Sequence, residues 1–162
     1  MNRIVRLDEC PQQMQLAADW FSRHWQNDSA LYFASMRESL QRKDGVPRWW
    51  IVTEEDSIIA GAGVIANDFH QRPDLTPNVC ALFVEPAWRG RGLARRLLET
   101  IRQDCAEAGI ARLYLISDHV GFYEKCGWQF LQKVQENDGR WISMFTILCE
   151  GEKNKNRDVK VF

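Results

Sequence analysis

The pattern of hydrophobic and polar positions predicts strands and helices in the order β-α-α-β-β-β-α-β-α-β-β. Helical stretches repeat apolar residues every three or four positions, as at Leu93, Leu97 and Ile101, whereas strands are short apolar runs bounded by turn residues. This order favours a mixed α/β sheet with an antiparallel front and one parallel pair. The expected strands cover residues 4–7, 49–52, 58–66, 79–84, 111–116, 128–134 and 141–148, and the expected helices cover residues 10–25, 29–41, 93–108 and 119–125.

Glycine and proline residues set the ends of several of these elements. Pro86 has no backbone N–H to donate to a ladder, so the strand at residues 79–84 should end before it. Gly109 follows the next helix, where a left-handed cap is expected. Gly61 and Gly63 lie inside a strand, which indicates a bulge or a close packing contact.

A glycine-rich loop, Arg89-Gly90-Arg91-Gly92, joins the fourth strand to the following helix. Without a Cβ, the two glycines let the backbone approach a ligand closely, and the free N–H groups at the helix start favour negative charge. The two arginines add cationic groups suited to phosphate oxygens. The loop is therefore predicted to hold a pyrophosphate; the alternative is an ordinary turn with two solvated arginines.

Two motifs carry a resemblance to a known family. Residues 89–94, Arg-Gly-Arg-Gly-Leu-Ala, fit the Arg/Gln-x-x-Gly-x-Gly/Ala signature of the GNAT superfamily of acyl-CoA-dependent N-acyltransferases, and Val84-Glu85-Pro86 fits its Val-x-Pro. Residues 122–128 resemble the family's Phe-Tyr-Glu-Lys-x-Gly-Phe, with Trp128 in place of the final Phe. The two motifs have the family's order and separation, and the close match covers residues 78–130.

The resemblance implies the GNAT fold, a mixed and mostly antiparallel sheet whose central strands splay apart and whose faces carry helices. Acetyl-CoA, the implied cosubstrate, would lie in the cleft between the fourth and fifth strands. The implied cofactor-binding residues are Leu82, Phe83 and Val84, whose backbone would pair with pantetheine, and Arg89, Gly90, Arg91, Gly92, Leu93 and Ala94, which would hold the pyrophosphate.

The same resemblance assigns the acid of the reaction. An amine attacks the thioester carbonyl and a thiolate leaves, so a proton donor placed at the sulfur assists the step. Tyr123 occupies the matching position of the second motif and is predicted to be that donor. The alternative is that Tyr123 packs its ring and bonds a backbone group.

The general base has several candidates. An alkylamine is mostly protonated at pH 7, and neutralising it costs about 4 to 5 kcal/mol, so a base must take its proton. His119 is a candidate because imidazole changes charge near neutral pH, with a surface position as the alternative. Glu85 would act through a water, unless it is only an exposed acid before a proline. Asp118 is expected to contact the substrate or to cap the short helix, and the Asn that usually precedes the tyrosine in the family is absent.

The acceptor pocket of the family is formed largely by the first two helices and their connection. That region of this chain holds Trp25 and Tyr32, whose rings would contact an amine, with core packing as the alternative. Asp74 precedes the fourth strand, where it would bind a cationic substrate or form a turn with Pro73.

Composition narrows the class of protein. The 162 residues are expected to form one domain over residues 1–150, followed by a charged tail at residues 151–162. The net charge of −1 argues against a nucleic-acid partner, and no stretch is long and apolar enough for a membrane span. The five cysteines are expected as reduced thiols in a cytoplasmic protein, and the three scattered histidines give no metal site.

The sequence therefore predicts an N-acetyltransferase that moves an acetyl group from acetyl-CoA to a primary amine of a small molecule, by direct attack in a ternary complex. Two alternatives stay open: acetylation of protein lysines or N-terminal amines, and a non-catalytic acyl-CoA-binding regulatory module. A homodimer built through the last strands is compatible with the resemblance. A nucleotide-phosphate enzyme is disfavoured because no Gly-Lys-Ser/Thr sequence ends the loop.

Overall fold

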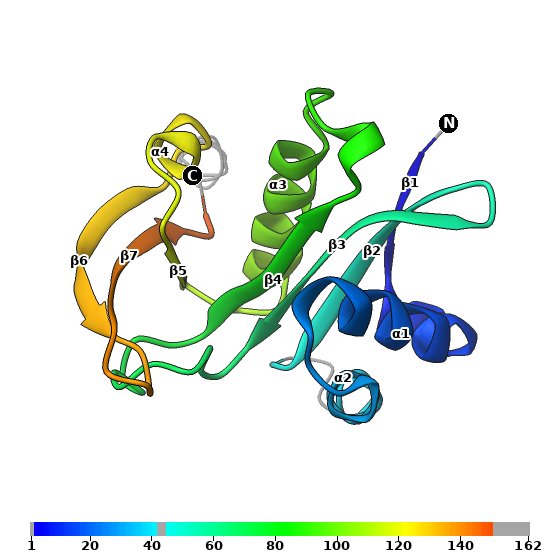
Figure 1. Cartoon of the computed structure of the whole chain (residues 1–162), viewed down its shortest axis with the longest axis horizontal. Coiled ribbons are helices and arrows are strands. Elements are labelled where there is room, and N and C mark those ends of the chain that lie inside the picture. The colour runs from blue at the N-terminus through cyan, green and yellow to red at the C-terminus, as the bar shows by residue number, and fades with distance from the viewer. Residues whose placement is uncertain (1, 42–44, 151–162) are drawn as a thin grey trace, which may run out of the picture.

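The computed structural model describes residues 2–41 and 45–150, which form a mixed sheet with helices on both faces (Figure 1). The seven-stranded sheet has the order β1-β2-β3-β4-β5-β7-β6, and only the β4–β5 pair within it is parallel. The strands are β1 (Arg3–Arg6), β2 (Arg48–Glu54), β3 (Ser57–Ile65), β4 (Asn78–Val84), β5 (Arg112–Ser117), β6 (Gln129–Gln135) and β7 (Trp141–Leu148). The α-helices are α1 (Met14–Trp25), α2 (Ser29–Glu38), α3 (Leu93–Glu107) and α4 (Phe122–Lys125).

Alternating side chains of the central strands face two hydrophobic cores, one on each side of the sheet. Trp50 and Val52 of β2 pack with α3, whereas their neighbours Trp49 and Ile51 pack with α1 and α2. The apolar face expected for the helix after the glycine loop is confirmed. The buried residues of α3 are Leu93, Leu97, Leu98, Ile101 and Cys105.

Gly61 and Gly63 of β3 meet both expectations drawn from the sequence. A Cβ on Gly63 would lie 2.5 Å from the ring of Trp49, and one on Gly61 would lie 2.7 Å from Phe21, so both positions are closely packed. The pairing with β4 also shifts its register between the two glycines. The extra residue is accommodated at Ala81, which has a positive φ of 56°. A bulge of this kind bends the strand and re-aims its groups, which matters for β4.

β4 and β5 separate after their first contact. The parallel ladder between them consists of Asn78 opposite Tyr114, supported by a 3.0 Å hydrogen bond from the Tyr114 N–H to the Pro77 carbonyl. Figure 1 shows the two strands spreading apart from this point, β5 toward α4 and β4 toward the start of α3. One edge of β4 is therefore left without a neighbouring strand, as the splayed fold expected from the sequence requires.

A loop closes the narrow end of this opening by pairing with the β6–β7 hairpin. His70 forms a bridge with Glu136, the Gln71 N–H donates to Gln135, and the Asn137 N–H donates to the Phe69 carbonyl at 2.8 Å. The buried His70 also bonds the side chain of Asn78 at the start of β4, so the loop is tied to both sides of the opening.

Some expected boundaries differ from the structure. The helix expected over residues 10–25 starts with one 3-10 turn, η2 (Pro11–Gln13), before α1 begins at Met14; a separate 3-10 turn, η1 (Leu7–Glu9), takes up Leu7, which was expected to end the first strand. The helix expected to reach residue 41 ends at Glu38, and the one expected from residue 119 starts at Phe122, because Gly121 before it has a φ of 86°. Gly109 has the expected left-handed conformation. The charged tail expected at residues 151–162 lies outside the described residues.

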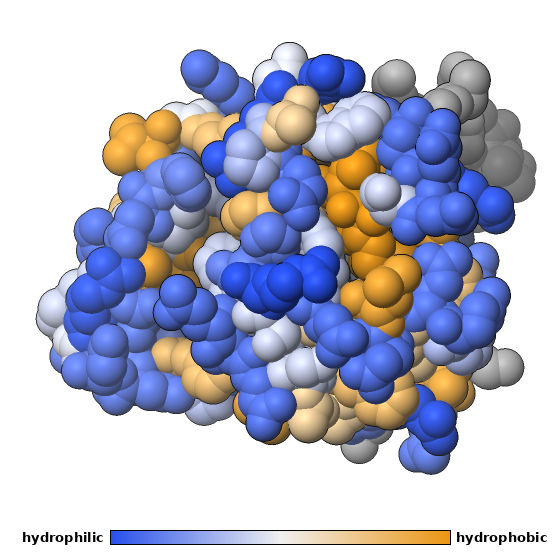
Figure 2. Space-filling view, turned by 45° about the vertical axis from the view of Figure 1, so that its right-hand side comes forward, coloured by the Kyte–Doolittle hydropathy of each residue, from blue (hydrophilic) through white to orange (hydrophobic). Residues whose placement is uncertain are grey.

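The surface seen in Figure 2 is mostly polar, and hydrophobic residues reach it in a narrow strip between polar ones. Within the described part of the chain, the helices are too short and too polar to cross a membrane.

Candidate active site

The separation of β4 and β5 leaves a cavity of about 550 Å³. Its walls come from α1, α2, β4, the end of β5, the loop after β3 and the β6–β7 hairpin. The cavity brings together six residues predicted for the site: Trp25, Tyr32, Leu82, Asp118, His119 and Tyr123.

Tyr123 lies at the wall formed by β5 and α4 and is 7 % exposed. Burial raises the pKa of its hydroxyl to about 12, and a hydrogen bond with Ser117 opposes this shift. The Ser117 hydroxyl also accepts the His119 backbone N–H at 3.0 Å, which fixes the end of β5 against α4. A phenol with this pKa stays protonated at neutral pH, so Tyr123 can donate a hydrogen bond into the cavity.

Asp118 and His119 follow β5 and are exposed at the rim of the cavity. Asp118 accepts a hydrogen bond from Arg140 of the hairpin, with an Nη2–Oδ2 distance of 2.9 Å. The expectation that Asp118 caps the short helix is wrong: Gly121 is the N-cap of α4, and no side chain bonds it. A glycine with positive φ takes over this turn, so Asp118 is free to face Arg140.

Glu85 lies on the α1 side of β4 and does not line the cavity. Its Oε1 accepts the indole N–H of Trp20 and contacts His24 Nε2, both at 2.8 Å. The His24 ring stacks on Phe83 with centroids 4.0 Å apart. Glu85 is half-buried in this cluster, so the alternative of an exposed acid before a proline is wrong, and a role as base requires a water path from the cluster.

Two of the residues predicted to contact the acceptor, Trp25 and Tyr32, line the cavity. The indole N–H of Trp25 donates to the Ala81 carbonyl at the β4 bulge, at 3.1 Å. The Tyr32 hydroxyl accepts from Asn27 at 3.1 Å, and its ring stacks on Phe21, so this side chain belongs to the core and to the cavity wall at once.

Asp74 does not line the cavity. Its two carboxylate oxygens accept hydrogen bonds from the Arg72 guanidinium at 2.9 and 2.8 Å, on the exposed side of the loop. The structure therefore supports the alternative prediction, that Asp74 belongs to a turn, over the prediction that it contacts a substrate.

Sequence reasoning missed Asp68, a half-buried acid that lines the cavity. Burial, together with a smaller contribution from the negative charge of Glu136, raises the pKa of its carboxyl to about 6. Glu136 lies in the same cavity but is remote in sequence. The only local signal for Asp68 is its position next to the aromatic Phe69 in a polar loop. Asp68 and Glu136 come together only when this loop pairs with the hairpin.

The glycine loop has the backbone geometry that its sequence predicts. Gly90 and Gly92 have φ values of 78° and 77°, and a Cβ at either would meet no atom within 4 Å. Arg89 donates from Nε to the Val84 carbonyl at 2.9 Å, and the Arg91 guanidinium lies 4.7 Å from the ring centroid of Trp88. Gly92 is the N-cap of α3 with no side-chain cap, so the first N–H groups of the helix remain open to an anion.

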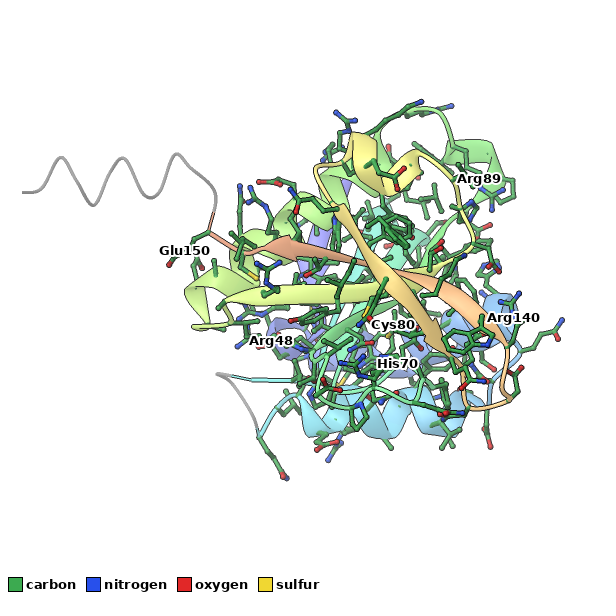
Figure 3. The ribbon with its side chains drawn as sticks, turned by 90° about the vertical axis from the view of Figure 1, so that its left-hand side faces the viewer. Arg48, His70, Cys80, Arg89, Arg140 and Glu150 are labelled. Atoms are coloured by element: carbon green, nitrogen blue, oxygen red, sulfur yellow. The ribbon has the colours of Figure 1, made fainter. Side chains whose placement is uncertain are left out.

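The open edge of β4 offers backbone groups at two of the three predicted positions. The Glu85 N–H donates to Ile59 of β3 at 2.8 Å, and Phe83 lies opposite Gly61 of β3. Because backbone groups alternate along a strand, those of Phe83 face β3 and those of Leu82 and Val84 face the opening. In Figure 3, Arg89 lies near the top of the molecule, and Cys80, His70 and Arg140 lie below it, so the glycine loop and the cavity occupy different levels.

The edge of β4 that no strand covers, the glycine loop with N–H groups open to an anion, and the buried tyrosine beside the cavity are the features expected of an acyl-CoA-dependent acyltransferase. The chain matches the family model described as the acetyltransferase (GNAT) domain over residues 7–148. It therefore belongs to the GNAT acetyltransferase family and is an acetyl-CoA-dependent N-acetyltransferase.

Solved structures with the same fold are distant in sequence. An aminoglycoside 6'-N-acetyltransferase in complex with coenzyme A has a TM-score of 0.69 and 15 % identity, covering 93 % of this chain and 98 % of the relative. A GNAT-family protein from Desulfovibrio desulfuricans has a TM-score of 0.68 and 16 % identity over 93 % and 100 % of the two chains. The yncA protein of Salmonella typhimurium, solved with acetyl-CoA, has a TM-score of 0.63 and 13 % identity over 94 % and 95 %. No curated protein sequence matches the chain significantly.

Proposed function

We propose that this protein transfers the acetyl group of acetyl-CoA to the primary amine of a small molecule bound in the cavity. The observation that carries the proposal is the cavity itself, of about 550 Å³, into which the buried Tyr123 and the aromatic residues of α1 and α2 both face. This volume lies in the range of small-molecule sites. The aminoglycoside 6'-N-acetyltransferase with the same fold is named for a small-molecule acceptor, which supports the same class of acceptor here.

The binding half of the proposal assigns the two ends of acetyl-CoA to different elements. Gly90 and Gly92 leave room for the pyrophosphate, and the open N–H groups of α3 bind its charge. The backbone groups of Leu82 and Val84 bind the pantetheine arm along the free edge of β4. Arg89 exchanges its contact with Val84 for a phosphate, because its guanidinium binds an anionic oxygen more strongly than a neutral carbonyl.

In the chemical half, Tyr123 donates a hydrogen bond to the sulfur as the C–S bond breaks. With a pKa of about 12, the phenol is a weaker acid than an ordinary thiol, so complete proton transfer to sulfur is unfavourable and a hydrogen bond to the thiolate is the favoured interaction. The attacking amine approaches from the α1–α2 side of the same cavity, and the reaction proceeds by direct attack in a ternary complex.

The pairing of the loop and the hairpin favours a small acceptor over a protein chain. An extended peptide needs an open groove, whereas the hydrogen bonds at Phe69, Gln71 and Glu136 close the narrow end of the opening. Lysine-containing peptides are therefore expected to be poor substrates.

Turnover with a panel of amines tests the proposal. The purified protein and acetyl-CoA are mixed with one amine at a time, and thiol release is followed. The panel holds arylalkylamines, polyamines, aminoglycosides and lysine or N-terminal peptides. We expect turnover with at least one small amine that exceeds turnover with every peptide. Preference for a peptide, or tight acetyl-CoA binding with no turnover on any amine, would overturn the small-molecule assignment in favour of one of the two alternatives.

A further inference from the structure

We propose that Asp68 binds the ammonium group of a monoamine with an apolar, ring-sized body and accepts its proton before the attack. This inference rests on the proposed function and adds to it a general base and a substrate class. It is carried by the position of the Asp68 carboxylate, by the pairing of the other charged groups in the cavity, and by the apolar character of the adjacent walls.

The fold holds Asp68 in place from both sides of its loop. The Asn67 side chain bonds both the N–H and the C=O of His70, at 2.9 and 3.0 Å, and forms a tight turn around Asp68 and Phe69. The Phe69 carbonyl accepts the Asn137 N–H of the hairpin. Asp68 is therefore an anchored group in the cavity wall, which a residue that must meet a substrate atom requires.

The other two acids of the cavity share one arginine. Arg140 donates from Nε to Glu136 at 2.7 Å and from Nη2 to Asp118 at 2.9 Å, and so engages two of the three acids that line the cavity. No side chain of residues 2–41 and 45–150 forms a hydrogen bond or ion pair with Asp68. Among the described residues, Asp68 is thus the one acid of the cavity lining without an arginine partner, which leaves its carboxylate to pair with the ammonium group of a substrate.

The walls near Asp68 are apolar. Leu31 and Phe69 line the cavity and are 66 % and 63 % exposed, so they form an apolar rim at its entrance. Deeper in, Tyr32 and Trp49 present ring faces and edges, with centroids 5.6 Å apart. A hydroxyl-rich sugar would leave its polar groups without partners against these walls, whereas an aromatic or branched alkyl body buries its surface.

The electrostatics suit a proton acceptor. Because the pKa of its carboxyl is about 6, the Asp68 carboxylate is a stronger base than that of an ordinary aspartate, and it is still ionised at pH 7. Three titratable groups face it from the surrounding elements: Glu136 from the hairpin, Cys80 from β4 and Tyr32 from α2. The negative charge of Glu136 raises the pKa of Asp68. The charge of Asp68 in turn contributes to the raised pKa of Cys80 and of Tyr32, for both of which burial is the main cause. The other titratable and charged groups of the cavity are Asp118, His119, Tyr123 and Arg140.

The proton and electron balance is complete without a further reactant. Asp68 takes one proton from the ammonium group, and the freed nitrogen lone pair forms the C–N bond to the acetyl carbon. The C–S bond breaks with its electron pair on sulfur, which accepts the hydrogen bond of Tyr123. The nitrogen then loses a second proton, which neutralises the thiolate, and Asp68 releases its proton to solvent.

The test uses Asp68→Asn in the full chain, with Asp74→Asn as the matched control from the same loop. With 2-phenylethylamine, we expect Asp68→Asn to lower kcat/KM by about 100-fold or more and to leave coenzyme A affinity unchanged. In the unmodified protein, kcat/KM should reach a plateau above about pH 6; in Asp68→Asn it should instead rise tenfold per pH unit toward the pKa of the free amine. Asp74→Asn should keep the plateau.

Two further readouts separate a chemical role from a structural one. O-benzylhydroxylamine, whose amino group is neutral at pH 7, should lose less than about 10-fold in Asp68→Asn because no base is required. The unmodified protein should prefer 2-phenylethylamine to spermidine and to an aminoglycoside. An unchanged pH profile in Asp68→Asn, or a preference of the unmodified protein for the polycations, overturns the inference and leaves the proposed function standing. Absence of turnover by the unmodified protein with every amine overturns both.

Discussion

At the scale of single residues, environment decides what the same side chain does. Asp68, Asp74 and Asp118 are all aspartates near the acceptor side, yet two are paired with arginines and one is not. The pKa of Asp74 is lowered by the hydrogen bond and charge of Arg72, whereas burial raises that of Asp68 to about 6. Tyr123 differs from Tyr114 in the same way: the first is buried beside the cavity and the second packs in a separate cluster.

Replacing Tyr123 by phenylalanine keeps the packed ring and removes the hydroxyl that faces the cavity. We expect Tyr123→Phe to lower kcat by about 10²- to 10³-fold, because the leaving sulfur loses its hydrogen-bond donor, with little change in coenzyme A affinity. Steady-state kinetics and calorimetric titration with coenzyme A measure the two effects. Tyr114→Phe is the control, and turnover of Tyr123→Phe equal to that of the control would remove the hydroxyl from the mechanism.

At the scale of elements, α3 and its two flanking glycines show how a helix can serve a ligand at one end and the fold at the other. Gly92 precedes the helix and Gly109 follows it, with φ values of 77° and 86°. A Cβ added at either position would not clash with another atom. A substitution there therefore acts only by disfavouring the left-handed backbone conformation. The two positions therefore form a natural pair for comparison.

Alanine at either glycine is expected to destabilise the fold by about 1 kcal/mol, because L-residues disfavour the left-handed region. Only Gly92→Ala should also weaken coenzyme A binding, by about tenfold or more, because the strained loop no longer presents its N–H groups to the pyrophosphate. Thermal unfolding and calorimetric titration of both variants provide the comparison. Equal coenzyme A affinity in Gly92→Ala and Gly109→Ala would refute the phosphate role of the loop.

At the scale of the whole molecule, the cavity exists because β4 and β5 diverge while the loop after β3 pairs with the β6–β7 hairpin. This closure buries an ionisable acid, which costs stability. A group whose pKa is raised on folding stabilises the fold only while it is protonated. The contribution of Asp68 is therefore fully favourable below its unfolded pKa of 3.8 and is lost as the pH rises through about 6.

Asp68→Asn should therefore be more stable than the unmodified protein at pH 7, by about 1 to 3 kcal/mol, after allowance for partial exposure. The difference should vanish near pH 3, where Asp68 is mostly protonated in both the folded and the unfolded chain. Urea denaturation between pH 3 and 7.5 measures it. Asp74→Asn should show the opposite sign, since the lowered pKa of Asp74 stabilises the fold at neutral pH. A constant difference between Asp68→Asn and the unmodified protein across this range would show that Asp68 is not a buried titrating group.

The sequence by itself determined the elements, their order and the cofactor loop. Apolar periodicity, Pro86 and Gly109 are local signals, and the chemistry of residues 89–94 depends on backbone conformations that neighbouring residues set. The resemblance also placed Tyr123, because its motif is contiguous. Local signals failed at Asp118, where the positive φ of Gly121 displaced the expected cap, and at residues 39–41, where the expected helix ends early.

Only the tertiary structure decided which groups share the cavity. Asp68 meets Glu136 because a loop pairs with a hairpin from the other end of the chain, and Glu85 turns to Trp20 and His24 because its strand faces α1 there. Contacts between residues more than sixty positions apart depend on strand register and on the divergence of β4 from β5. Register is fixed by packing across the whole sheet, which short stretches of sequence do not encode.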